Sequence, residues 1–191
     1  MIADRNDEGP LAAPALQRAL RRWRTLNRIK QAHAAELLGV AQSTISRWES
    51  GRQCFEPSEA RKVQALVGTR FSSAADAVLA RLIRESGRPI HLVCDTSHRL
   101  LACSRVRAAG FGVPDADLIG RSLWRYSTPE LIAEEAHLAS CGWYDSAAPA
   151  PVEFETGDNG VCHVPIRPGR CRWTRMALSD GMPARLVETL S

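Results

Sequence analysis

The sequence predicts an α+β chain of two domains, in which an all-α bundle precedes an antiparallel sheet with flanking helices. Three observations support this. The length of 191 residues accommodates one large domain or two small ones. Apolar residues recur at helical spacing up to about residue 86, and after that they fall mainly in short β-prone runs. Residues 1–70 hold twelve Lys or Arg against seven acids, whereas residues 71–191 hold thirteen against fourteen.

The first domain is expected at residues 15–68, after a disordered arm at residues 1–14 that is charged and rich in Gly and Pro. Helices are expected at about 15–26, 31–38, 42–50 and 57–67. Gly39 and Gly51 should end the second and third of these, and Pro57 suits the first turn of the fourth.

Residues 69–88 are expected to form a linker and a coupling helix, and the last domain should span residues 89–191. The coupling helix, residues 74–86, carries an apolar side made of Val78, Leu79, Leu82 and Ile83. Strands are expected at 89–95, 99–104, 151–157, 161–168, 170–181 and 183–190, with a loop and short helix at 112–124 and a longer helix at 127–143. Asp180-Gly181 is a hairpin signal.

Charge and cysteine usage indicate the partner and the compartment. Between residues 15 and 53 eight basic residues oppose two acids, which predicts an anionic partner for this part of the chain. The six cysteines form no C-x-x-C pair, and the N-terminal residues are polar and acidic, unlike a secretory leader. We therefore expect reduced thiols and a cytoplasmic location. No apolar run is long enough to cross a bilayer, so no membrane partner is expected.

The stretch QAHAAELLGVAQSTISRWESG, residues 31–51, reads as two short helices around a glycine corner. It resembles the helix-turn-helix of the Cro/CI-like (XRE) family of bacterial and phage regulators, over about residues 15–67. Ala35 stands where the helices cross, Gly39 at the corner, and Ile45 and Trp48 face inward. The resemblance implies a lambda-repressor-like bundle that binds double-stranded DNA and regulates transcription, with no catalytic residues.

The same resemblance implies which residues contact DNA, because a helix fits the major groove and short polar side chains can reach base edges. The expected base contacts are Gln42, Ser43, Thr44, Ser46 and Arg47. The expected phosphate contacts are Arg24, Gln31, Lys30 and Arg52. Gln42 suits adenine, and Arg47 suits guanine unless it binds phosphate instead. Glu49 is interpreted as a structural partner for an arginine of the first helix.

Residues 89–190 resemble a PAS-like sensor domain. The segment DLIGRSLW and the closing segment RWTRMALSDGMPARLVETL support the resemblance, together with the order of two strands, short helices, one longer helix and three strands. It implies a domain that dimerises, binds a small molecule on its sheet, or does both. The effector is unspecified and no cofactor is assigned.

Catalytic and metal-binding alternatives find little support in this half. Cys162 and His163 suggest a nucleophile and a base, but neighbours on a strand point to opposite faces. His91, His98, Cys94 and Cys103 lack the spacing of a zinc site, so no metal is expected. Haem, which some PAS domains bind through His or Cys, singles out no residue. Glu134 and Glu135 are interpreted as a solvated helix face.

The sequence thus predicts a bacterial, cytoplasmic transcriptional regulator that binds an operator as a homodimer, with a PAS-like domain for dimerisation and sensing. The alternative is a protein-interaction or antitoxin-type module, in which the helical domain binds a protein partner. A small enzyme, the third reading, would require a paired nucleophile and base.

Overall fold

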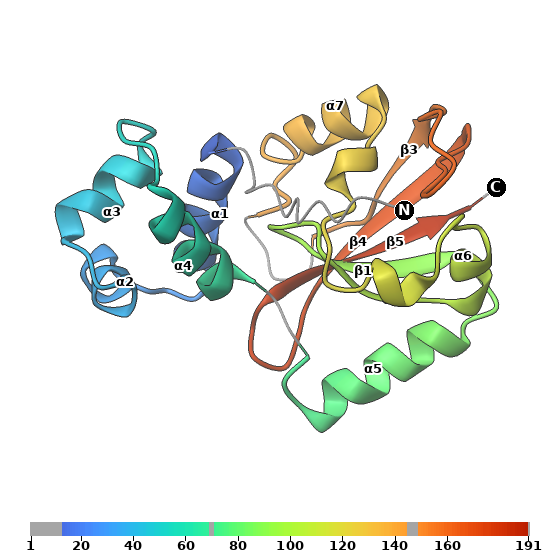
Figure 1. Cartoon of the computed structure of the whole chain (residues 1–191), viewed down its shortest axis with the longest axis horizontal. Helices are drawn as coiled ribbons and strands as arrows, with labels where there is room; N and C mark the ends of the chain where they lie inside the picture. Colours follow the sequence, from blue (N-terminus) through green and yellow to red (C-terminus); the bar gives the residue numbers. More distant parts are fainter. Residues whose placement is uncertain (1–12, 69–70, 145–148, 191) are drawn as a thin grey trace, which may run out of the picture. The chain divides into compact units, whose positions relative to one another are not determined.

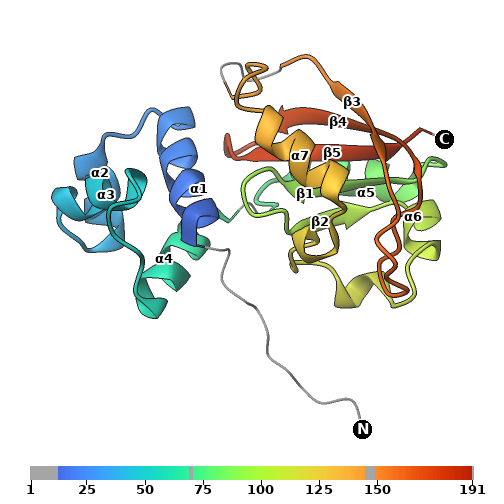
Figure 2. The same ribbon diagram turned by 90° about the horizontal axis from the view of Figure 1, so that it is seen from above.

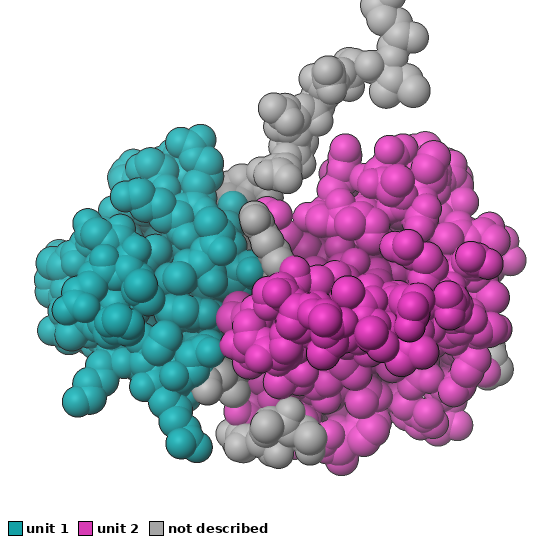
Figure 3. Space-filling view, turned by 90° about the horizontal axis from the view of Figure 1, so that it is seen from below, with its two compact units in different colours: residues 1–68 teal, residues 69–191 magenta. Residues whose placement is uncertain are grey.

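The structure is a computed structural model that describes residues 13–68, 71–144 and 149–190. The predicted N-terminal arm lies outside these ranges, except for its last two residues, which belong to the first helix. The chain divides into two compact units, Met1–Gly68 and Thr69–Ser191 (Figure 3). In the described ranges no helix combines the length and the apolar composition that a membrane crossing requires.

The described part of the first unit folds into helices α1 (Ala13–Leu26), α2 (Gln31–Leu38), α3 (Gln42–Glu49) and α4 (Pro57–Val67) (Figure 1). Their apolar sides meet in one core, in which Leu20, Ile45, Trp48 and Val63 have no exposed surface. The ring of Trp48 also packs on Phe55, with centroids 4.7 Å apart. Burial of the two large residues of α3 fixes which side of that helix faces solvent.

Gly39 forms the corner between α2 and α3. Its φ of 68° lies in the left-handed region, and its N–H donates to the Glu36 carbonyl. A Cβ built on Gly39 would meet nothing within 4 Å. The backbone angle, rather than lack of space, therefore favours glycine at this corner.

The second unit begins with helix α5 (Ala74–Glu85) and contains a five-stranded antiparallel sheet in the order β2-β1-β5-β4-β3 (Figures 1 and 2). The strands are β1 (Ile90–Cys94), β2 (Leu100–Cys103), β3 (Val152–Thr156), β4 (Gly169–Ala177) and β5 (Pro183–Thr189). Between β2 and β3 lie α6 (Arg105–Ala109), the 3₁₀ turns η1 (Asp115–Asp117) and η2 (Trp124–Tyr126), and α7 (Pro129–His137). The predicted PAS-like order of elements is confirmed, whereas α6 was not predicted.

The sheet has an apolar core on each face, and the two cores use alternate residues of the same strands. On β5, Ala184 and Leu186 belong to the core that α5 covers, and Val187 belongs to the opposite core. Figure 1 shows α5 on one side of the sheet and α7 on the other. The sheet is therefore buried on both faces, and the face toward α6 and α7 carries the cavity described below.

The predicted apolar side of α5 is divided in the structure. Ile83 is buried, and Leu79 is partly buried against the same sheet core. Val78 is 45% exposed and Leu82 is 61% exposed.

Helix α5 is held at its start by Asp76, whose carboxylate accepts a 2.6 Å hydrogen bond from the Ser179 hydroxyl. This bond and others from Ser179 and Ser72 keep the pKa of the Asp76 carboxyl well below its usual value.

The strand predicted at 161–168 is wrong, because this segment is an irregular loop. Pro165 and Pro168 cannot donate to a strand ladder. The amide of Asn159 satisfies the loop backbone instead, since its Oδ1 accepts from Val161 N and Ile166 N at 3.1 and 3.0 Å. Its Nδ2 donates to the Val164 carbonyl at 2.9 Å.

This loop also overturns the expected separation of Cys162 and His163. The Cys162 sulfur lies 3.8 Å from His163 Nδ1, and both residues are exposed. Neighbouring side chains point to opposite faces only in a strand, and the chain forms no strand at Cys162 and His163.

Candidate nucleic-acid interface and ligand cavity

Helix α3 presents a polar side to solvent. Gln42, Ser43, Ser46 and Arg47 are exposed, and Thr44 is half-buried. The Arg47 Nε donates to the Ser43 carbonyl at 3.3 Å, so its guanidinium lies along its own helix. The side chains predicted to contact bases thus lie on the solvent side of α3, in a helix that its buried residues hold in place.

The N-termini of α2 and α3 are uncapped by side chains within the described structure. Lys30 and Ala41 occupy the two N-cap positions without a side-chain hydrogen bond, and neither first turn contains an acid. Helices α4, α5 and α7, in contrast, all have side-chain caps. The first N–H groups of α2 and α3, with the positive ends of their dipoles, are therefore available to an anion.

A chain of polar contacts links α1, α2 and α3 through the carboxylate of Glu49. Arg24 donates to it from Nε at 2.6 Å and from its NH2 nitrogen at 2.8 Å. The Gln31 amide donates to the same carboxylate at 2.9 Å, and its oxygen accepts from Gln42 Nε2 at 3.1 Å. We refer to these four residues as the Glu49 network. Its two glutamines are predicted DNA contacts, so the network fixes their relative positions.

Burial alone would raise the pKa of the Glu49 carboxyl, but bonds from Arg24 and Gln31 outweigh burial and lower it. Bonding to Glu49 in turn raises the pKa of Arg24. A third Arg24 nitrogen donates to the Ile29 carbonyl at 3.0 Å. Arg24 thus has protein partners where the sequence predicts a phosphate contact, and Glu49 binds a first-helix arginine, as expected. Lys30 and Arg52 are exposed, and Gln31 is half-buried.

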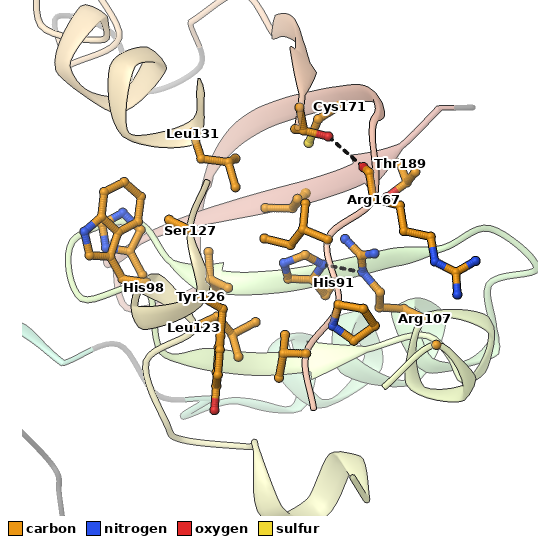
Figure 4. A pocket seen from close by; sticks show the side chains of 18 of the residues that line it. His91, His98, Arg107, Leu123, Tyr126, Ser127, Leu131, Arg167, Cys171 and Thr189 are labelled. Carbon is orange, nitrogen blue, oxygen red and sulfur yellow. Dashed lines mark hydrogen bonds between the residues drawn. The ribbon is translucent and has the colours of Figure 1, made fainter. Parts of the chain in front are cut away.

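The second unit contains a cavity of about 470 Å³ between the α6–α7 face of the sheet and the loop at 164–168 (Figure 4). Apolar side chains form much of the lining, among them Val93, Phe111, Leu131 and Trp173. The loop contributes Val164 and Ile166, the segment wrongly predicted as a strand. Cavities of this size and composition are typical of small-molecule sites.

A buried ionic cluster adjoins the cavity. Asp95, with no exposed surface, accepts from Arg185 at 2.7 Å and from Arg175 at 3.1 Å. Arg185 also binds Glu135 of α7 at 2.7 Å, and its guanidinium lies 4.3 Å from the centre of the Trp173 ring. Although burial alone would raise it, the pKa of the Glu135 carboxyl is held low by Arg185 and His98. The interpretation of Glu135 as part of a solvated face is therefore wrong.

Arg107 and His91 form a second polar pair that lines the cavity. Arg107 Nε donates to His91 Nδ1 at 3.2 Å (Figure 4). Burial, aided by the charge of Arg107, holds the pKa of His91 well below its ordinary value. Burial also lowers the pKa of Arg107 itself. His91 is therefore neutral, and the positive charge of the pair belongs to Arg107.

Sequence reasoning singled out His91 and His98 but not Arg107, Asp95 or Arg185. Arg107 lies two residues after Arg105, and such a pair of nearby arginines looks like ordinary surface in the sequence. Cys94 and Cys103, which were considered with the histidines as metal ligands and set aside, are buried. In the described ranges no group of three His, Cys, Asp or Glu side chains is arranged to hold a metal ion.

Comparison with protein families supports the helix-turn-helix prediction for the first unit. Residues 20–72 match the family described as Helix-turn-helix. One similar solved structure is the PAS domain of an HTR-like protein from Haloarcula marismortui, which is 17% identical with a TM-score of 0.41, over 61% of this chain and 90% of that one. Another is an RNA-binding light-oxygen-voltage receptor, which is 10% identical with a TM-score of 0.42, over 93% of this chain and 59% of that one. No curated protein matches the chain.

Proposed function

Because residues 20–72 match the helix-turn-helix family, we propose that this protein is a cytoplasmic transcriptional regulator that binds an operator as a homodimer. Helix α3 enters the major groove, and the N-terminus of α2 contacts the backbone. The PAS-like unit dimerises the chain and senses a small molecule in its cavity.

The observation that carries this proposal is the polar, solvent-facing side of α3 together with the uncapped N-termini of α2 and α3. Gln42, Ser43, Thr44, Ser46 and Arg47 supply donors and acceptors for base edges, and the free N–H groups of α2 suit a phosphate. Lys30 and Arg52 add positive charge nearby. Arg24 acts mainly by holding Glu49, and through it Gln31, rather than as an independent phosphate contact.

Dimerisation is supported by Val78 and Leu82 of α5. They are one helical turn apart, and both are exposed although Ile83 of the same helix is buried. One recognition helix reaches too few base pairs to select a genomic site, and related domains solve this by binding two half-sites. We therefore assign the exposed side of α5 to a second copy of the chain.

The operator is first identified by genome-wide binding and footprinting, which return the site and its symmetry. Gel shifts then compare operator with scrambled DNA at several salt concentrations. Gln42→Ala should cost about 1–3 kcal/mol on the operator and little on scrambled DNA. Lys30→Ala should weaken both about equally and reduce the salt slope by about one unit. Lys62→Ala, which removes the same charge from the exposed surface of α4, is the matched control.

Equal losses on both DNAs for Gln42→Ala would contradict base reading, and the absence of salt-dependent binding would contradict the proposal as a whole. For the dimer, Val78→Glu with Leu82→Glu should give monomers in sedimentation. Ile132→Glu, at an exposed apolar position on α7, should leave the dimer intact. A monomeric wild-type chain would refute the homodimer.

A further inference from the structure

The lining of the cavity is biased toward positive charge. Its basic lining residues are the arginines and histidines Arg107, Arg167, Arg170, Arg185, His91 and His98. No Asp or Glu of the described ranges lines it. The lining, much of which is apolar, therefore carries several arginine charges and no carboxylate of the described residues.

Two of these arginines already have counterions outside the cavity. Arg185 is neutralised by Asp95 and Glu135, and Arg170 binds Glu153 at 2.8 Å. Their charges are satisfied without a ligand.

Neither Arg167 nor Arg107 has a carboxylate of the described residues within ion-pair distance. Arg167 is exposed, so water can solvate its charge, and the case that differs is the half-buried Arg107. Its Nε is occupied by His91, and its two terminal nitrogens have no hydrogen-bond partner among the described residues. His91 is neutral and cannot balance the charge. A half-buried cation without a counterion is unfavourable, and an anion in the cavity would offset this cost.

The rest of the lining indicates the shape of the uncharged part of such an anion. Phe111, Trp124, Tyr126 and Trp173 supply aromatic surface, and Trp124 stacks on His98 with centroids 4.4 Å apart. Aromatic walls favour a flat ring, which can stack offset or edge-on. The volume of about 470 Å³ lies in the lower half of the range for ligand sites, which suits a compact ring system better than a long chain.

We propose that this cavity binds a small aromatic carboxylate, whose carboxylate pairs with the terminal nitrogens of Arg107 while its ring packs between Phe111 and Trp173. An Arg fork matches a carboxylate in geometry and binds it with two parallel hydrogen bonds. The inference rests on the proposed sensing role of the PAS-like unit and names the class of ligand for that role.

The test uses the full chain without DNA and two probes of nearly equal shape, 1-naphthylacetate and its neutral amide, 1-naphthylacetamide. Calorimetric titration should show the carboxylate binding at least about tenfold more tightly than the amide. Arg107→Met keeps an unbranched side chain but removes the charge, so it should abolish this preference. Arg170→Met removes a lining arginine that has its own counterion, so it should retain the preference.

Melting temperatures of the unliganded proteins separate binding from folding. Arg107→Met should melt close to wild type, because the loss of an uncompensated cation offsets the loss of the hydrogen bond to His91. Equal affinity of wild type for acid and amide, binding of neither probe at millimolar concentration, or a preference that survives in a folded Arg107→Met would overturn the inference. Operator gel shifts on the same proteins without any probe keep the two proposals distinct, since they test DNA binding alone and the calorimetric titrations test the cavity alone.

Discussion

Replacing Glu49 by alanine removes the acceptor on which Arg24 and Gln31 converge. The carboxylate accepts hydrogen bonds of 2.6, 2.8 and 2.9 Å, and its side chain is 5% exposed against 19% for Arg24. Arg24 would keep its bond to the Ile29 carbonyl but would lose its counterion. The variant therefore tests whether the Glu49 network stabilises the helical unit and positions its predicted DNA contacts.

The expected cost lies between two limits. Breaking a fully buried ion pair costs about 3–5 kcal/mol, whereas an exposed pair contributes about 0–1 kcal/mol. A pair with this partial exposure should cost about 2 kcal/mol. The helical unit is small enough that its whole stability is of the order of 3–8 kcal/mol. A loss of 2 kcal/mol should lower its melting temperature by about 8–16 °C.

Hydrogen exchange of the amides in α1, α2 and α3 measures this unit inside the intact chain. The most protected amides should exchange about 30-fold faster in Glu49→Ala, the factor that corresponds to 2 kcal/mol. Glu36→Ala is the matched control, because the Glu36 side chain is 75% exposed and its ion-pair partner among the described residues is His33, so the change should stay within about 0.5 kcal/mol. Protection in Glu49→Ala equal to that in wild type would refute the structural role of the network.

Three further predictions concern single positions. Gly39→Val should cost about 1–3 kcal/mol, since a β-branched residue is strained at a φ of 68°, and an unchanged melting temperature would place the corner elsewhere. Asp95→Asn should cost the sheet unit about 3–5 kcal/mol in urea unfolding, because the buried Arg175 and Arg185 would lose the carboxylate charge that they share, and wild-type stability would contradict this. Because His91 stays neutral when folded but protonates when unfolded, stability should fall as pH drops below about 6.5, and urea unfolding at pH 5–8 should show a shallower fall for His91→Gln. Parallel pH profiles for the two proteins would exclude His91 as the cause.

The helices of the first unit were predictable because single residues mark their ends. The bounds of α2 and α4 agree with the prediction, since Gly39 ends one and Pro57 opens the other. Helix α6 has only five residues, too few for a helical period to show in the sequence. The segment at 161–168 has the apolar alternation of a strand, but its prolines and the side chain of Asn159 favour a loop.

The cavity was beyond sequence reasoning for a different reason. Which arginine keeps an uncompensated charge depends on pairings between distant positions, such as Arg185 with Asp95, 90 residues apart. Local patterns cannot distinguish Arg185, which has two carboxylate partners, from Arg107, which has none among the described residues. Resemblance to PAS-like domains predicted a sheet with a pocket, but which side chains line that pocket is seen only in the folded structure.

The contact between Gln31 and Gln42 has a consequence for how the proposed DNA recognition can diverge. The Gln42 amide is held by Gln31, and Gln31 by Glu49. If Gln42 reads a base as proposed, its orientation is therefore set before DNA arrives. A mutation that gives position 42 a new base preference also leaves the Gln31 amide oxygen without its donor. Duplicated copies of this gene would therefore acquire new operators by paired changes at positions 31 and 42, and single changes would tend to lose the old site before gaining another.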